Sequence, residues 1–136
     1  MSATMWLRAA SVISVLFAGG HTLGGQQAWS PIGETEVLTA MRSFHFTTEG
    51  VSRTYLDFYR GFGFLLSVFL VLQAVLLWQL AGFARTQPAL VRPMVGTFLV
   101  ASIASAILTA VFIFPLPVLF SAAVIVCLGF AFVTSR

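Results

Sequence analysis

The chain has 136 residues, of which 59% are hydrophobic and only 8% are charged. A soluble domain carries about 25% charged residues, so this composition cannot cover a water-exposed surface, and lipid must surround most of the molecule. The net charge of +3 comes from seven arginines without any lysine. They are scattered at the ends of apolar segments, which is typical of membrane topology signals and excludes a nucleic-acid-binding patch.

The first apolar segment spans residues 5–25. Arg8 lies near its start and can extend its guanidinium group to the lipid headgroups. One helix face carries small or weakly polar residues at steps of three and four, namely Ser11, Ser14, Ala18, His21 and Gly25. Because such faces let helices approach closely in lipid, we expect this one to point into a bundle. The segment also has features of a signal peptide, but no clear A-x-A site follows it, so we expect it to be retained.

A polar loop of residues 26–60 follows. Thr35 and Glu36 predict the start of a short amphipathic helix that runs to about Phe46. Beyond it, four charged residues of alternating sign recur at helical spacing: Glu49, Arg53, Asp57 and Arg60. If the second span begins early, near Val51, these side chains form a ladder of ion pairs on one helix.

Two further apolar stretches complete the chain. The second span covers residues 61–84, and within it we expect Gln73 to hydrogen-bond across helices. The stretch from residue 94 to 133 is about twice the length of one span of about 20 residues, so it must fold back. Pro115 and Pro117 mark the turn. We therefore predict spans over residues 94–114 and 116–133, and we expect Ser102, Ser105 and Thr109 to face the bundle interior.

These segments predict an all-α fold: a single domain with a four-transmembrane-helix bundle and a short amphipathic helix in the outer loop between spans 1 and 2. Both termini and the connection between spans 2 and 3 then share one side, with four arginines and no acidic residue. The opposite side has three arginines and all the acidic residues. The positive-inside rule therefore places both termini in the cytoplasm and the loop outside.

The ionisable residues of the loop and of the outer end of span 1 form the candidate site. An ionisable side chain at membrane depth, such as His21, is a functional candidate by default. We predict that a polar pocket forms at the outer mouth from six residues: His21, His45, Glu49, Asp57, Tyr59 and Arg60. Imidazole, carboxylate and phenol groups together could transfer protons or bind a polar headgroup. The alternative is that each histidine is structural.

No cofactor is predicted. His21 and His45 could in principle ligate a haem axially, but the chain has only these two histidines, one on a span and one in the loop. No sequence motif for a catalytic metal is present, and the single cysteine, Cys127, lies in an apolar stretch. We therefore predict no metal site.

Two short segments carry a resemblance. Gly20–Gly24 (Gly-His-Thr-Leu-Gly) and Tyr55–Gly63 resemble segments of a group of small, uncharacterised bacterial four-span membrane proteins. In layout, the chain is similar to DoxX-like proteins and to the sterol-binding and isomerase (EXPERA) bundle families. In the latter, polar residues inside a helical bundle handle a lipid-like ligand. The resemblance implies a bacterial inner-membrane location, and it assigns no role to any residue of this chain.

Two functions remain open. The first is binding of, or catalysis on, a small amphipathic molecule such as a lipid, quinone or isoprenoid at the outward polar pocket. The second is an accessory or assembly subunit of a larger membrane complex, packed through small-residue faces, with a homo-oligomer as another form of association. Transport has less support, because Gln73 is the one strongly polar residue at mid-membrane depth. Membrane lipids are expected to surround the protein in every case.

Overall fold

The computed structural model describes residues 2–26 and 32–135. In chain order the elements are α1 (Ala3–Gln26), α2 (Glu36–Ser43), β1 (His45–Thr48), β2 (Val51–Thr54), α3 (Tyr55–Phe83), α4 (Pro88–Phe112) and α5 (Pro115–Thr134). Four of the helices, α1, α3, α4 and α5, are long and apolar enough to cross a membrane. The prediction of an all-α fold with four membrane-spanning helices and a short helix in the loop is thus confirmed.

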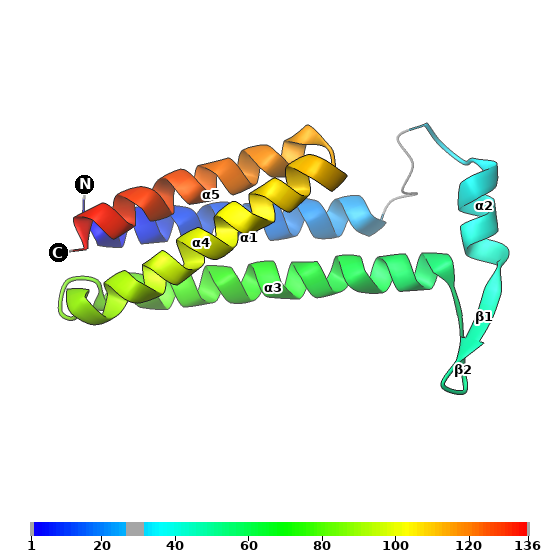
Figure 1. Ribbon diagram of the computed structural model, residues 1–136, viewed down its shortest axis with the longest axis horizontal. Coiled ribbons are helices and arrows are strands. Elements are labelled where there is room, and N and C mark those ends of the chain that lie inside the picture. The colour runs from blue at the N-terminus through cyan, green and yellow to red at the C-terminus, as the bar shows by residue number, and fades with distance from the viewer. Residues whose placement is uncertain (1, 27–31, 136) are drawn as a thin grey trace. The chain divides into compact units, whose positions relative to one another are not determined.

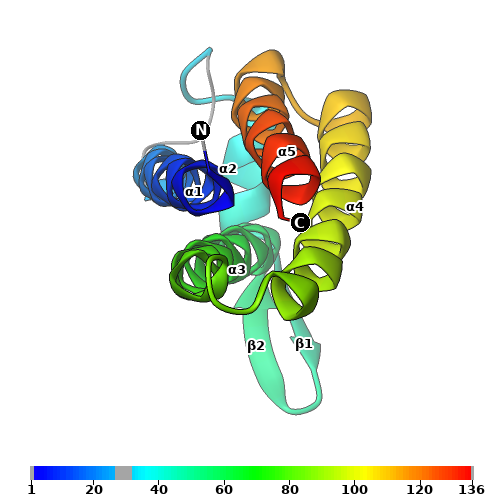
Figure 2. The same ribbon diagram turned by 90° about the vertical axis from the view of Figure 1, so that its left-hand side faces the viewer.

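The first of two compact units comprises residues 1–17 and 70–136. Parts of α1, α3, α4 and α5 share one buried core in this unit; Figure 2 shows these helices from one end. The fully buried side chains include Leu7 of α1, Leu77 of α3, Val91 of α4 and Leu128 of α5. The start of α1, the end of α5 and the connection between α3 and α4 lie at the same end of this unit (Figure 1).

Polar contacts between α1 and α3 support this unit. The hydroxyl of Ser11 donates to the carbonyl oxygen of Ala74 at 2.7 Å. The amide of Gln73 donates to the hydroxyl of Ser14 at 3.0 Å, which confirms the predicted interhelical bond. Ser11, Ser14 and Ala18 are all buried, so the small-residue face of α1 points inward as predicted. Gly25 belongs to the end of α1 where side-chain surroundings are not described.

The polar face of α4 is exposed along most of its length. Ser102 is buried and Thr109 is half-buried, but Ser105 is exposed, so the prediction for Ser105 is wrong. The reason is that α4 contributes to the core mainly through its first half, at Val91 and Val95. The helix also begins earlier than residue 94, at Pro88, where a proline at the first helical position has no N–H bond to lose.

The turn between α4 and α5 was placed correctly. Ile113 and Phe114 separate the two helices, and Pro115 occupies the first helical position of α5. The fixed φ angle of proline suits that position. The fourth membrane-spanning helix, α5, therefore begins one residue earlier than the predicted residue 116.

The second compact unit comprises residues 18–69. Thr35 caps α2 as predicted, because its side chain accepts a hydrogen bond from the amide of Leu38. However, α2 ends at Ser43, and the chain then forms an antiparallel hairpin of β1 and β2. The prediction of a helix to Phe46 and of a helical charge ladder is therefore wrong, because Glu49 lies in the hairpin turn and Arg53 lies in β2.

Candidate functional site

The carboxylate of Asp57 is engaged at the start of α3. It accepts hydrogen bonds from the backbone amide of Thr54 at 3.0 Å and from the Thr54 hydroxyl at 2.9 Å. In return, the amide of Asp57 donates to the Thr54 hydroxyl at 3.1 Å. This reciprocal arrangement is a capping box, in which two otherwise unpaired backbone donors are satisfied. It explains why α3 begins at Tyr55 rather than at residue 61, and it places the Asp57 carboxylate in the cap of this helix.

His21 contacts a backbone group of the neighbouring helix. Its Nε2 atom lies 3.0 Å from the carbonyl oxygen of Gly63, and the imidazole is half-buried between α1 and α3. A carbonyl oxygen can only accept, so Nε2 must carry a proton and donate it. One turn further along α3, the hydroxyl of Ser67 lies 2.8 Å from the hydroxyl of Thr22, the residue after His21. His21 is thus part of a polar seam that joins α1 to the first half of α3.

His45 and Glu49 lie on the hairpin, and both are exposed. The Nδ1 atom of His45 lies 2.9 Å from the carbonyl oxygen of Ser43, which can only accept, so Nδ1 donates this hydrogen bond. Glu49 and Gly50 form the two-residue turn between Thr48 and Val51, with φ angles of 52° and 79°. Two consecutive positive φ values are typical of a type I′ turn, so Glu49 is placed by turn geometry.

Of the six predicted residues, the structure connects His45 and Asp57 through Thr54, which was not predicted. His45 pairs with Thr54 across the hairpin, and Thr54 holds the Asp57 carboxylate. Tyr59 and Arg60 follow on the next turn of α3 and are exposed. His21 instead bonds to the carbonyl of Gly63, and Glu49 lies in the hairpin turn. Sequence reasoning missed Thr54, although the spacing Thr54-x-x-Asp57 is itself the signal of a capping box.

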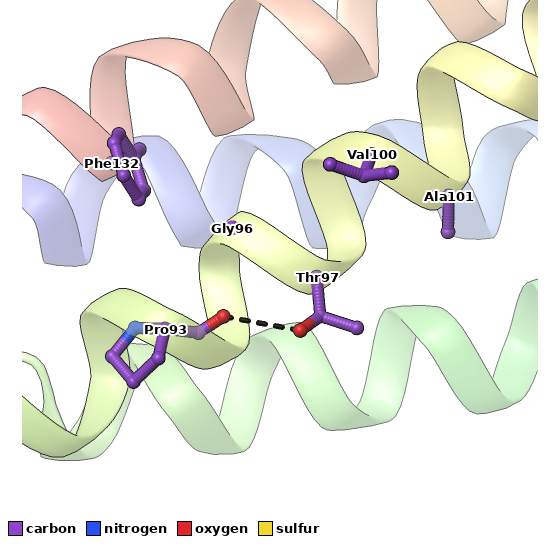
Figure 3. A pocket seen from close by; sticks show the side chains of 6 residues that line it. All are labelled: Pro93, Gly96, Thr97, Val100, Ala101 and Phe132. Atoms are coloured by element: carbon purple, nitrogen blue, oxygen red, sulfur yellow. Dashed lines mark hydrogen bonds between the residues drawn. The ribbon is translucent and has the colours of Figure 1, made fainter.

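An open groove lies on the other compact unit (Figure 3). Its volume is about 650 Å³, and five of its lining residues come from α4 and one, Phe132, from α5: Pro93, Gly96, Thr97, Val100, Ala101 and Phe132. The hydroxyl of Thr97 is turned to its own helix, where it donates to the carbonyl of Pro93 at 3.2 Å. At the same place, the Arg92 guanidinium lies 4.7 Å from the centre of the Phe132 ring. The groove is therefore apolar, with one cation beside it.

Within residues 2–26 and 32–135, no group of three or more His, Cys, Asp or Glu side chains is placed to hold a metal ion. Comparisons with protein-family models, with curated proteins and with solved structures found no match. The class of protein therefore follows from the fold itself: four long apolar helices make this chain a polytopic α-helical membrane protein.

Proposed function

We propose that the protein is an assembly subunit of a larger membrane complex and that α4 packs against a transmembrane helix of another chain. The observation that carries this proposal is the exposed small-residue face of α4. Ala101, Ala104 and Ser105 are all exposed, although α4 spans the membrane. Helices associate in lipid through small residues, because these let the backbones approach and form van der Waals contacts and weak hydrogen bonds.

The Ser105 hydroxyl also supports packing against another helix, because it can form a hydrogen bond there. Thr97 and Thr109 on the same helix donate to carbonyl oxygens four residues earlier, at 3.2 and 2.8 Å. These bonds satisfy both hydroxyls within α4. Ser105 makes no such side-chain bond in the described part of the chain, so its hydroxyl is available to a neighbouring helix. In hydrocarbon, where water is absent, an unpaired hydroxyl favours a partner that can bond with it.

The experiment is native mass spectrometry of the protein extracted gently from its own membrane. We expect a second protein at fixed stoichiometry, and we expect Ala104→Phe to remove it. The matched control is Ala122→Phe, which places the same ring on an exposed alanine of α5. A monomer without a partner would contradict the proposal, and a homo-oligomer would replace it with self-association.

A second candidate is a site for a small amphipathic molecule at the polar end of residues 18–69. The arrangement of His45, Thr54 and Asp57 supports it, because the imidazole is exposed and Thr54, its partner across the hairpin, bonds to the Asp57 carboxylate. Such a pair could accept a hydrogen bond from a polar headgroup. This candidate keeps the bacterial inner membrane, with both termini in the cytoplasm and the loop outside, as the proposed setting.

The same mass spectra test this candidate. A discrete bound small molecule, weakened by His45→Ala and by Arg60→Gln, would support it. Asp57→Asn is a poor probe, because that change also weakens the capping box at the start of α3. Retention of the molecule at wild-type level in both other variants would remove the basis for the polar site.

A further inference from the structure

A chain of ring contacts joins the hairpin to α3. The Phe46 ring lies 5.0 Å from that of Tyr55 and 6.2 Å from that of Phe58. Phe44 stacks on Tyr55 at 5.7 Å, and Phe62 meets Phe58 at 5.1 Å. We call these five residues the aromatic ladder. Apart from the half-buried Phe46, every member keeps more than half of its surface exposed. The hairpin and the first turns of α3 therefore carry a row of touching rings, most of which stay exposed among the described residues.

The length of α3 indicates the depth of this surface. At 1.5 Å per residue, its 29 residues extend about 43 Å, whereas the hydrocarbon core of a bilayer is about 30 Å thick. The excess falls at the start of the helix, where Asp57 and Arg60 are the charged residues. If the rest of α3 fills the hydrocarbon core, its first turns fall in the headgroup layer and Phe62 falls where the hydrocarbon begins.

The ring contacts place the hairpin at the same depth, because Phe46 touches both Tyr55 and Phe58 on those first turns. Figure 1 shows that β1 and β2 run across the direction of α3 rather than along it. A hairpin with this orientation lies in the plane of the membrane. Aromatic side chains are enriched at this level of membrane proteins, where an apolar ring and a polar surrounding meet.

The two faces of the hairpin differ in chemistry. Residues paired across an antiparallel ladder share a face. Phe46 pairs with Arg53, and Thr48 pairs with Val51, so these four residues share one face, on which the Phe46 ring touches α3. The opposite face carries Thr47 and Ser52 as another cross-strand pair. The first face thus combines a ring, an aliphatic side chain and a cation, as expected for contact with phosphate-bearing lipids.

We propose that the hairpin is an interfacial anchor: it lies in the lipid headgroup layer with its Phe46 face turned toward the acyl chains. The aromatic ladder continues the lipid-facing surface of α3 into the headgroup layer, and Arg53 and Arg60 face lipid phosphates there. The anchor fixes the depth of α3 in the bilayer. This role is separate from the packing of α4, so either can fail without the other.

The test uses nitroxide labels on neighbouring residues of β2. Val51→Cys and Ser52→Cys are compared in a Cys127→Ala background, because these two exposed residues are adjacent and point to opposite faces. The protein is reconstituted into vesicles of phosphatidylcholine and phosphatidylglycerol. Collision rates with oxygen, which dissolves in lipid, and with a nickel chelate, which stays in water, are measured at each label.

We expect the ratio of oxygen to nickel collisions to be severalfold higher at position 51 than at position 52. Phe46→Ser should lower the ratio at position 51 and leave position 52 unchanged. Equal, nickel-dominated collisions at both positions would overturn the proposal, because the hairpin would then lie in water. Shielding of position 51 from both reagents would also overturn it, since a protein surface would then cover the ladder. Circular dichroism of each variant verifies that the helices remain.

Discussion

The side-chain amide of Gln73 donates to the hydroxyl of Ser14 at 3.0 Å, and this hydroxyl donates in turn to the carbonyl of Ala10 at 2.9 Å. A short relay therefore connects α3 to the backbone of α1 inside the bundle. Ser14 is fully buried, so its two bonds replace the water that the membrane interior lacks.

Removal of this relay should destabilise the bundle. We expect Gln73→Leu to lower the free energy of unfolding by about 0.6 kcal/mol, and by at most about 1.7 kcal/mol, the range of interhelical bonds in lipid. Unfolding in mixed micelles by added SDS measures the change. Gln79→Leu is the matched control, because Gln79 is exposed on the same helix. Equal effects of the two changes would argue against a role of the relay.

The capping box should control where α3 begins. Thr54→Ala removes the hydroxyl that both donates to and accepts from Asp57, and loss of such a cap costs about 0.5–2 kcal/mol. We expect faster hydrogen exchange at the amides of Leu56 and Asp57, with little change at the middle of α3. Ser52→Ala serves as the control on the same strand. Unchanged exchange at Asp57 would show that the cap does not hold the helix start.

Substitutions in the hairpin turn should change the stability of the hairpin according to the φ angle at each position. Glu49 has a φ of 52°, a left-handed conformation that costs an ordinary L-residue about 1–2 kcal/mol and that asparagine tolerates better. We therefore expect Glu49→Asn to stabilise the hairpin and Gly50→Val to destabilise it. Protection of the β1 and β2 amides from exchange reports both effects. If Glu49→Asn weakens the hairpin instead, the carboxylate has a role beyond the turn.

Two helical glycines should differ in their tolerance of a methyl group. A Cβ atom at Gly63 would meet His21 Nε2 at 3.9 Å, an ordinary contact, whereas one at Gly96 would meet a Phe132 ring carbon at 3.2 Å. Alanine favours a helix over glycine by about 1 kcal/mol. We expect Gly63→Ala to raise the free energy of unfolding by most of this amount. Gly96→Ala should raise it by less, because the Phe132 ring must move. SDS unfolding compares the two, and a larger gain at Gly96 would contradict the packing seen here.

The sequence was informative where one physical effect dominated. Length and hydropathy predicted the four spans, since lipid leaves few alternatives to a helix. The burial of Ser11 and Ser14 followed from their spacing. The hairpin was missed because the charges at Glu49, Arg53 and Asp57 repeat every four residues and so imitate a helix. The competing signal was the β-branched residues on both sides of Glu49-Gly50, which favour strands around a tight turn.

The candidate site was harder to predict for a similar reason. Side-chain type suggested chemistry for Asp57, but its position three residues after Thr54 makes it part of a cap. The exposure of α4 beyond Ser102 could not be read from the sequence either, because its small residues suit an internal face and an external one equally well. Such a face becomes distinct only when the neighbours of the helix are known.

Ile113 and Phe114 alone separate α4 from α5. A connection of two residues leaves α4 and α5 little freedom to separate at this end, so the two helices form one helical hairpin. Two of the four apolar helices therefore share one short connection and form a single structural unit of the bundle.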